Sequence, residues 1–556
     1  MCGVPFHSAD TYIAALVDKG YKVAICEQVE DPAQAKGLVK REVVQIVTPG
    51  TVSNGIMLNE KENNYLASVF ASDRNMALAY CDISTGELYS VDFPLKRGKE
   101  TLFNEIAKIA PKEILIPEAL LDQIEENEIR EVTGAYLNIL SDLYFSCEAG
   151  RKAIFKHFEI KAPEGVGLGD KDEQITALGA LFSYLSNTQK NDLSHISKLK
   201  IYDIDSRMSL DKTAIRNLEI TETLYEKKVQ GSLLGVLDKT NTAMGSRKMK
   251  KWLRADEINK RLDAVQLLYD DLLLRNNLRQ YLKQVYDLER LGGRIACGNA
   301  NGRDLIALKN SLSALPDLKH DLCDCESALL TELEARIDPL AELCSAIDTA
   351  IEDDPPFTIK EGKLIKTGYS ADLDELKFSV KDAQLWIANL EESERVRTGI
   401  RNLKVGFNKV FGYYLEVTKS FYDAIPENYI RKQTLSNCER FITPELKDME
   451  SLVLNINKME YELFTELRQC AAAHIVAIQE TAEAISSLDV LLSFAEVSAN
   501  LSYVKPEVNE ESEIYIKNGR HPVIEQMCTG GTFVSNDTYI DADTSSLLLI
   551  TGPNMY

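Results

Sequence analysis

The sequence has few of the features that mark membrane, secreted or metal-binding proteins. No uninterrupted apolar run reaches the roughly 18 residues that a membrane-spanning helix needs, and no signal peptide opens the chain. The eleven cysteines are scattered, and Cys323 and Cys325 are the only close pair. None of the spacings suits a zinc site. We therefore expect free thiols, no bound metal, no membrane partner and a cytoplasmic location.

Positive charge is also scarce. Lysine and arginine number 63 against 86 aspartates and glutamates, so the formal net charge is −23. A chain this acidic is unsuited to coating nucleic acid over its whole surface. Any contact with DNA should be confined to a local basic surface. Otherwise the composition is that of an ordinary globular protein, and 556 residues predict three to five domains.

A long helical hairpin organises the second half of the chain. Asp372 and Glu375 are spaced as a capping box, and Gly399 is typical of a helix end. The returning helix is predicted to begin at Thr443-Pro444. Apolar residues recur at alternating spacings of three and four in both helices: Leu373, Leu376, Val380, Ala383, Ile387 and Leu390, then Met449, Leu452, Ile456, Met459 and Leu463. Two such seams predict an antiparallel coiled-coil arm.

The segment between the two helices has a different period and a different charge. Leu415 and Val417 alternate with Tyr414 and Glu416, which predicts a two-stranded unit. Residues 397–447 contain nine lysines and arginines against five acids, a balance of +4 in a chain of −23. A basic tip on an acidic arm favours a phosphate backbone as partner, although charge alone leaves a solvated arm surface equally open.

These residues carry a family resemblance. The run TGIRNLKVGFNKVFGYYLEVTKS, followed by YIRKQTL and ERFITPELK, closely resembles the clamp of the MutS family of bacterial DNA mismatch-recognition proteins. The resemblance implies a clamp at the end of lever helices that grips the backbone of double-stranded DNA. The residues that would contact this backbone are Lys404, Asn408, Lys409, Lys419, Arg431 and Lys432.

The first 200 residues resemble two further parts of that family. Residues 1–50 are similar to the second half of the mismatch-binding domain, whose wedge phenylalanine and reading glutamate lie upstream in the family, so we expect this chain to lack both. Residues 51–200 alternate strands and helices, which predicts an α/β domain. The resemblance makes it the connector, which helps to dock MutL. Asp82 sits at a strand end beside Thr85-Gly86, where a turn former is more common than a catalytic carboxylate.

Residues 201–371 and 448–500 have helical periodicity and resemble the core and lever helices. Lys248, Lys250 and Lys251 form a basic cluster, a pattern more common on a solvated face than in a site. Near Arg254 and Asn455 the sequence is shorter than the family pattern, by a turn-containing loop and by about one helical turn respectively. The lever arm and clamp occupy residues 372–447.

Residues 501–556 resemble the opening of the family's ATPase domain. An apolar strand is predicted from Ser546 to Thr551, and the chain then ends inside a phosphate-binding loop formed by Gly552, Pro553, Asn554, Met555 and Tyr556. Phe533 matches the residue that stacks on adenine. ATP and Mg²⁺ are implied by the family, but the lysine and hydroxyl that complete the loop lie beyond Tyr556. We therefore expect no ATP hydrolysis by this polypeptide and a weak dimer at most.

The sequence thus predicts a multidomain, mostly helical α+β protein with an α/β connector, an all-α core, a coiled-coil arm, a small β insert and the start of a P-loop domain. The resemblance implies a nucleoid-associated DNA mismatch repair protein that partners double-stranded DNA, MutL and a second copy of itself. The alternative is a non-catalytic clamp or scaffold that binds duplex or branched DNA without reading mispairs. A coiled-coil ATPase with P-loop halves fits less well, because its arms are usually longer and lack a preceding α/β domain.

Overall fold

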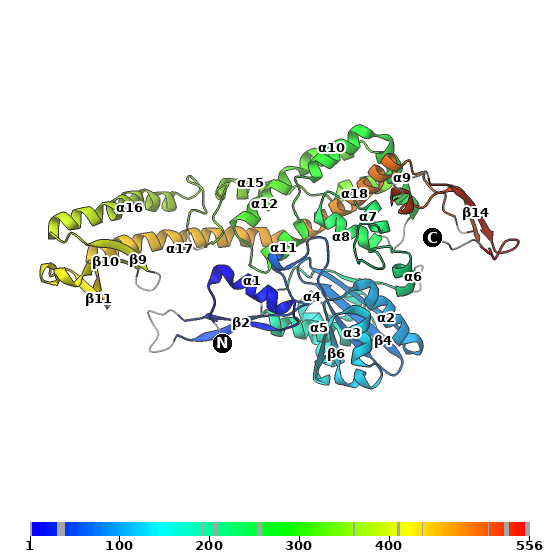
Figure 1. Ribbon diagram of the computed structural model, residues 1–556, viewed down its shortest axis with the longest axis horizontal. Helices are drawn as coiled ribbons and strands as arrows, with labels where there is room; N and C mark the ends of the chain where they lie inside the picture. The colour runs from blue at the N-terminus through cyan, green and yellow to red at the C-terminus, as the bar shows by residue number, and fades with distance from the viewer. Residues whose placement is uncertain are drawn as a thin grey trace. The chain divides into compact units, whose positions relative to one another are not determined.

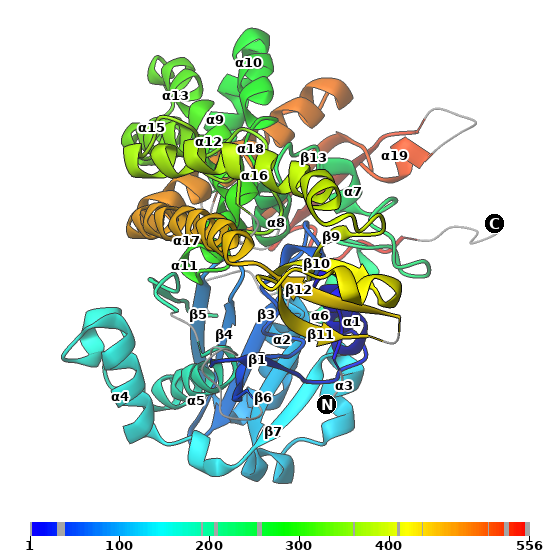
Figure 2. The ribbon, with the colours of Figure 1, turned by 90° about the vertical axis from the view of Figure 1, so that its left-hand side faces the viewer.

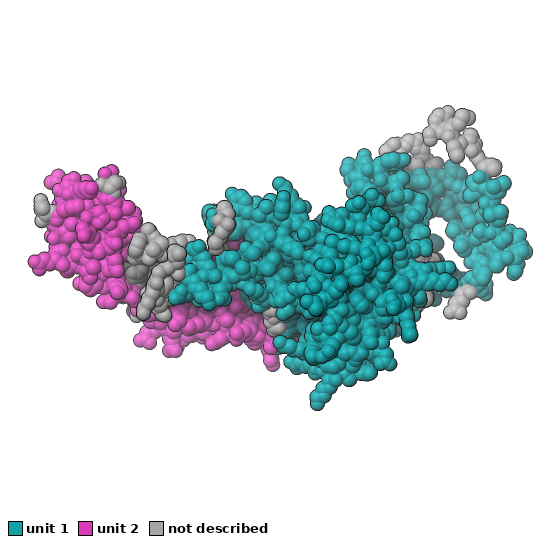
Figure 3. All heavy atoms as spheres, turned by 90° about the horizontal axis from the view of Figure 1, so that it is seen from below, with its two compact units in different colours: residues 1–299, 310–339, 474–556 teal, residues 300–309, 340–473 magenta. Residues whose placement is uncertain are grey.

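The computed structural model describes residues 3–30, 39–190, 193–204, 210–252, 258–359, 362–408, 412–435, 437–509, 511–527 and 533–550. The chain forms two compact units, coloured separately in Figure 3. Unit 1 contains residues 1–299, 310–339 and 474–556, and unit 2 contains residues 300–309 and 340–473. Helices predominate, and the described strands form separate sheets. The protein is therefore a multidomain α+β protein, as the sequence predicts.

Unit 1 opens with a small α/β piece. Helix α1 (Phe6–Val17) precedes an antiparallel pair of strands, β1 (Val23–Gln28) and β2 (Arg41–Val47). Its own core is small: the buried apolar side chains are Ile13, Val17, Val47 and Val52. The turn that follows β2 is held from outside, because the buried carboxylate of Glu113 accepts hydrogen bonds from the Thr48 hydroxyl and the Gly50 N–H.

A six-stranded mixed sheet follows, ordered β7-β6-β3-β4-β5-β8. Its central strands β3, β4 and β5 are antiparallel, whereas β6, β7 and β8 run parallel to their neighbours. The sequence pattern does not reveal β7 and β8, which are short. The strands are β3 (Tyr65–Ala71), β4 (Asn75–Asp82), β5 (Glu87–Pro94), β6 (Glu113–Pro117), β7 (Tyr136–Leu140) and β8 (Leu199–Ile201).

Helices cover both faces of this sheet (Figure 2). Helices α2 (Gly98–Ile109) and α3 (Glu126–Thr133) pack on one face, and α4 (Cys147–Phe158) and α5 (Asp172–Gln189) pack on the other. Successive strand residues point to opposite faces, and both faces are apolar, so the strands form nearly continuous hydrophobic runs.

Asp82 forms the turn between β4 and β5. Its fully buried carboxylate accepts hydrogen bonds from the side chain of Asn63, the N–H of Asn64, and both the N–H and hydroxyl of Ser84. Gly86 completes the turn with a positive φ of 79°. With four donors the carboxylate is saturated, which confirms its structural role.

The rest of unit 1 is a helical core. It comprises α6 (Lys212–Asn217), α7 (Leu233–Leu237), α8 (Ala243–Trp252), α9 (Ile258–Asp270), α10 (Leu272–Leu282), α11 (Leu288–Ala296), α13 (Leu315–Cys323), α14 (Ala328–Arg336) and α18 (Ile475–Leu501). Helix α18 packs against α7 to α11 and α14 (Figure 1). By length and mean hydropathy α18 is long and apolar enough to cross a membrane, although charged residues interrupt its apolar run, and 67% of its apolar window is buried inside the protein.

Carboxylates on α18 anchor the surrounding elements. Asp489 accepts hydrogen bonds from the backbone N–H groups of Asn241 and Thr242 and from the Thr242 hydroxyl, immediately before α8. Gly245 is required beside it, because a Cβ there would lie 2.3 Å from the Asp489 carboxylate. Nearer the start of α18, Glu483 forms ion pairs with three cations: Lys200 at 3.2 Å, Lys248 at 3.4 Å and Arg336 at 3.0 Å.

In unit 2, two long helices form the predicted hairpin, α16 (Ala371–Thr398) and α17 (Pro444–Ala473). The predicted capping box is wrong: the N-cap of α16 is Ser370, whose hydroxyl accepts from the Leu373 N–H, so the helix begins one residue before Asp372. Gly399 ends α16 with a φ of 71°, as predicted. The Thr443 hydroxyl likewise caps α17, and α17 runs without a break through Asn455. Residue 254 lies outside the described residues.

A buried ion pair joins these helices. Lys377 on α16 approaches Glu460 on α17 to 2.7 Å, and Glu460 is fully buried. The second oxygen of Glu460 accepts from the Leu364 N–H at 3.3 Å, and Lys377 also donates to the Ile365 carbonyl at 2.6 Å. The segment before α16 is thereby tied to both helices. Lys377 and Glu460 each lie one residue after a predicted seam residue, Leu376 and Met459. A polar pair in the contact between two helices fixes which of their turns face each other. Unit 2 also contains α15 (Ala341–Ala350) and the start of α12 (Gly302–Ser313).

The C-terminal segment of unit 1 forms a hairpin of β13 (Glu513–Gly519) and β14 (Asn536–Asp541), with a short helix α19 (Ile524–Met527) between them. The strand predicted from Ser546 is wrong: residues 546–550 have no strand structure, and the side chains of Leu547, Leu549 and Ile550 are almost fully exposed. An apolar run becomes a buried strand only where neighbouring strands pair with its backbone, and no described strand lies beside it.

Removing one member of the buried pair should destabilise the helical hairpin. We expect Lys377→Met to lower the free energy of unfolding of unit 2 by about 3 kcal/mol, because the Glu460 carboxylate is left buried without a counter-ion. The double variant Lys377→Met/Glu460→Met should recover most of this loss. Lys458→Met is the matched control, since its pair with Glu462 is exposed, and should cost less than about 0.5 kcal/mol. Additive effects of the two substitutions, measured by urea denaturation, would contradict the pairing.

The cations around Glu483 predict a pH dependence. Burial raises the pKa of this carboxyl, but Lys248, Lys200 and Arg336 outweigh it and bring the pKa down to about 2. The stabilisation is therefore complete above the unfolded pKa of about 4.3 and is lost as the pH falls towards 2.

We expect Glu483→Gln to destabilise unit 1 at pH 7, and the difference from the wild-type protein to shrink between pH 4.5 and pH 2. Glu480→Gln, on the same helix in an exposed pair with Lys198, serves as control and should show little difference at any pH. Unfolding curves measured by circular dichroism across this range test it; a difference independent of pH would refute the assignment.

Candidate nucleic-acid interface

The chain between α16 and α17 forms a four-stranded antiparallel sheet, called here the arm sheet (residues 404–442). Its order is β11-β12-β10-β9. The sequence predicts only the first two strands, so the two-stranded unit is corrected to four. The strands are β9 (Lys404–Asn408), β10 (Gly412–Thr418), β11 (Ile430–Thr434) and β12 (Cys438–Ile442). Residues 409–411, which include Lys409, lie outside the described residues.

One face of the arm sheet is buried. Leu415 and Val417 of β10 are fully buried, while Tyr414 and Glu416 point to the opposite face, as the alternation predicts. The buried face packs on the ends of the two long helices through an apolar cluster: Leu390, Ile400, Leu403, Leu415, Val417, Tyr429, Phe441 and Leu446. The arm sheet is therefore anchored to α16 and α17 by its own small core.

The other face carries a polar row that crosses all four strands. In the strand register, Lys404 lies opposite Glu416, Glu416 opposite Arg440, and Arg440 opposite Gln433. Arg440 donates to Glu416 at 3.1 Å and to Gln433 at 3.0 Å, and its guanidinium lies 4.2 Å from the ring centre of Tyr414. Arg440 is thus neutralised and fixed in place. At the end of the row, Lys404 is exposed and forms no ion pair with any described residue.

Other cations of the segment are also neutralised. Arg431 pairs with the buried Glu439 at 3.2 Å, and Arg397 pairs with Glu394 at 2.7 Å. Burial raises the pKa of the Glu394 carboxyl, but hydrogen bonds from Arg397 and from the Tyr429 hydroxyl bring it below its ordinary value. These arginines stabilise the fold, and their charge is not freely available to a ligand.

Among the described residues of the segment 397–447, the cations that are exposed and form no ion pair are Arg401, Lys404, Lys419, Lys432 and Lys447. Of the predicted contacts, Lys404, Lys419 and Lys432 belong to this free set, whereas Arg431 does not. Asn408 is placed by its backbone at the far end of β9, four residues or about 13 Å from Lys404. Sequence reasoning did not single out Arg401 and Lys447, although the charge count of the segment includes both.

Lys432 lies at an irregularity in the sheet. The register of β11 against β12 shifts between Arg431 and Gln433, so Lys432 is the extra residue of a β-bulge. A bulge redirects side chains relative to a regular ladder. Lys432 therefore presents its exposed ammonium group at the outer edge of the arm sheet.

Of the predicted nucleotide residues, the structure describes only Phe533. Phe533 is half-buried in the segment before β14, and residues 552–556 lie outside the described residues. No group of His, Cys, Asp or Glu side chains in the described ranges could hold a metal ion. The described cysteines form no disulfide. The arm sheet is therefore the candidate site that the geometry supports.

The sequence is similar to known proteins over its whole length. Residues 1–55, 64–197 and 213–495 match the family models of MutS domain I, MutS domain II and MutS domain III. Similar proteins named DNA mismatch repair protein MutS occur in Alkaliphilus oremlandii (48% identity), Acetivibrio thermocellus (46%) and Methanosarcina barkeri (43%). Each alignment covers 100% of this chain and 64%, 65% and 64% of the respective relative.

The chain thus spans just under two thirds of the length of these relatives. Three consecutive domain matches and an identity of 43–48% over the whole chain establish common descent. This protein belongs to the MutS family of DNA mismatch repair proteins.

Proposed function

We propose that this chain acts in DNA mismatch repair by gripping double-stranded DNA with the arm sheet. In this proposal the arm sheet is the clamp, and α16 and α17 are the lever arm that carries it. The observation that carries the proposal is the set of exposed, unpaired cations on the arm sheet and the adjoining helix ends of a protein whose net charge is −23. The family membership adds support, because the relatives are named for mismatch repair.

The geometry favours contacts with phosphates over contacts with bases. Direct reading of sequence requires an element that fills a groove, most often a helix in the major groove. The arm sheet offers lysines at its margins, Lys404 on β9 and Lys432 on β11, and a lysine after β10, Lys419. Such point charges fix the position of a protein on the duplex without reading its sequence.

The remaining parts receive roles by family membership. We assign residues 1–50 to the mismatch-binding domain, 51–200 to a connector that docks MutL, 201–371 and 448–500 to the core and lever helices, 372–447 to the arm and clamp, and 501–556 to the start of an ATPase domain. A homodimer and ATP with Mg²⁺ belong to the same proposal. In the described residues Phe533 has neither a phosphate-binding loop nor a metal-binding cluster beside it.

The proposal predicts a change in the salt dependence of DNA binding. The slope of log affinity against log salt is negative. Replacing Lys404, Lys419 and Lys432 with Ala, singly and together, should reduce its magnitude by about 0.9 for each phosphate that is no longer neutralised. Arg431→Ala should change the slope less, because Glu439 already neutralises that guanidinium. Affinities of duplexes of equal length and different sequence should agree within about two-fold, because phosphate contacts carry no sequence information.

Lys458→Ala is the matched control, since it removes one exposed positive charge from α17 outside the arm sheet. Fluorescence anisotropy with a labelled duplex at several salt concentrations gives the slopes. A triple variant whose slope equals that of the wild-type protein would place the DNA site elsewhere.

A further inference from the structure

Two buried arginines of the helical core hold a backbone segment that belongs to neither the core nor the sheet. The segment 59–62 precedes β3. Arg247 on α8 donates to the Glu60 carbonyl at 2.8 Å, and Arg290 on α11 donates to the carbonyls of Asn59 at 2.9 Å and Glu62 at 2.6 Å. The two arginines are 2% and 4% exposed.

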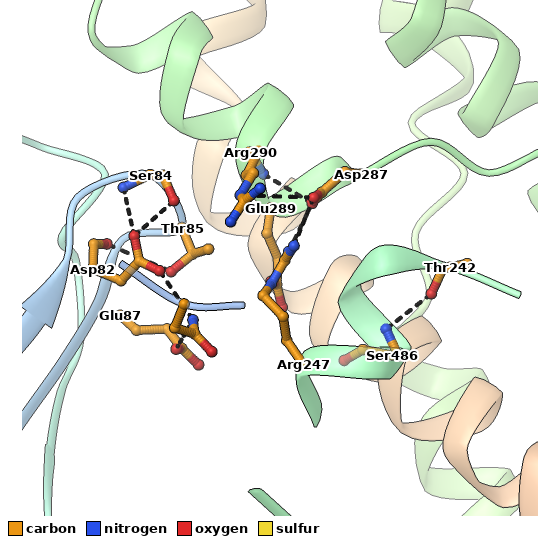
Figure 4. A network of polar contacts seen from close by, with 12 residues as sticks. Asp82, Ser84, Thr85, Glu87, Thr242, Arg247, Asp287, Glu289, Arg290 and Ser486 are labelled. Carbon is orange, nitrogen blue, oxygen red and sulfur yellow. Dashed lines mark hydrogen bonds and ion pairs between the residues drawn. The ribbon is translucent and has the colours of Figure 1, made fainter. Parts of the chain in front are cut away.

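Carboxylates from α11 and its N-cap fix the first of these guanidinium groups. Asp287 accepts two parallel hydrogen bonds from Arg247, both at 2.8 Å, and Glu289 accepts a third at 2.6 Å (Figure 4). Asp287 is also the N-cap of α11 and accepts from the Arg290 N–H at 3.2 Å. The same charges that bind the segment therefore lock α8 to α11.

The turn between β4 and β5 docks on the same two helices. Gly293 of α11 lies so close to it that a Cβ would be 2.4 Å from the Ser84 carbonyl oxygen. At the end of this turn, Glu87 forms a short ion pair with Lys251 of α8. Burial raises the pKa of Glu87, but Lys251 and Lys200 outweigh it and bring the pKa to about 2. The segment 59–62 and the turn 83–87 thus share one docking surface on α8 and α11.

This arrangement favours two discrete states over gradual movement. If the carbonyls of 59–62 leave, Arg290 loses both of its side-chain hydrogen bonds, whereas Arg247 loses the one to Glu60 and keeps Asp287 and Glu289. Burying the unsatisfied charged donors that remain is costly unless water enters. The contacts therefore form or break together. The docked state also carries a residual cost, because Nε of both Arg247 and Arg290 has no hydrogen-bond partner in the described structure.

We propose that Arg247 and Arg290 form a latch that couples the α/β part of unit 1, residues 48–201, to its helical core. Closed, the latch holds the segment 59–62 directly, and by joining α8 to α11 it keeps together the two helices on which Lys251 and Gly293 contact the turn 83–87. Open, it frees both at once while the six-stranded sheet and α18 keep their own hydrogen bonds. The device depends on the planar guanidinium, because the ammonium of a lysine cannot bind Asp287 with two parallel hydrogen bonds and also reach Glu289 and a carbonyl.

The test is hydrogen–deuterium exchange of the Arg247→Lys variant. We expect amide exchange to be faster by about ten-fold or more in residues 59–62 and 83–87, with unchanged exchange in β3 and α18. A glutamate-specific protease should also cleave faster after Glu60 and Glu62. Arg279→Lys is the matched control: Arg279 pairs with Glu496 at 2.7 Å in the same core but makes no described contact with the segment.

Exchange of the two segments at the wild-type rate in Arg247→Lys would overturn the latch. If that variant instead exchanges faster throughout unit 1, Glu289→Gln decides, since it removes one charged acceptor and leaves the guanidinium in place. A local increase confined to 59–62 and 83–87 in Glu289→Gln supports the latch. No increase, or a global one, overturns it.

Discussion

The structure of unit 1 depends on polar side chains that are buried on a largely apolar helix. Helix α18 is hydrophobic enough to cross a membrane, and each carboxylate that it buries needs partners. Asp489 is fully buried and obtains them from the N-terminus of α8. Glu483 is partly exposed and forms ion pairs with cations of three different segments. Burial raises the pKa of the Asp489 carboxyl even against these hydrogen bonds. The apolar surface of α18 drives the packing, and the carboxylates determine which helix occupies which position.

In unit 2 the same kinds of residue serve two purposes. Arg397, Arg431 and Arg440 each form an ion pair with a neighbouring carboxylate, so their positive charge is neutralised within the fold. The lysines are left without such partners. Arginine suits the structural role because its fork binds a carboxylate or stacks on a ring with defined geometry, whereas an exposed ammonium is a mobile point charge. Because these arginines are paired and the lysines are not, the number of basic residues in the segment 397–447 is larger than the number of positive charges available to a ligand.

Local patterns in the sequence were enough to predict the helices of the arm and the ends marked by Gly399 and Thr443, because periodicity and caps depend on neighbouring residues. Strands β11 and β12 were missed, since both are short and charged, and they become part of the sheet only because β12 pairs with β10 and β11 pairs with β12. The pairing of Arg431 with Glu439 follows from that register and could not be predicted without it.

The cluster at Lys248 was interpreted as a solvated face, yet Lys248 and Lys251 bind Glu483 and Glu87, which are remote in sequence.

The bulge at Lys432 has a consequence for the solubility of the protein. Strands β9 and β11 are the two outer strands of the arm sheet, so each has a row of backbone groups that could pair with a strand from another molecule. Lys404 lies on one of these strands, and Lys432 interrupts the regular ladder of the other. Charged side chains and bulges at sheet margins oppose such growth. Lys404 and Lys432 therefore also oppose pairing of the arm sheets of separate copies of the protein, edge to edge. Replacing them with β-branched residues would favour extended sheets between molecules.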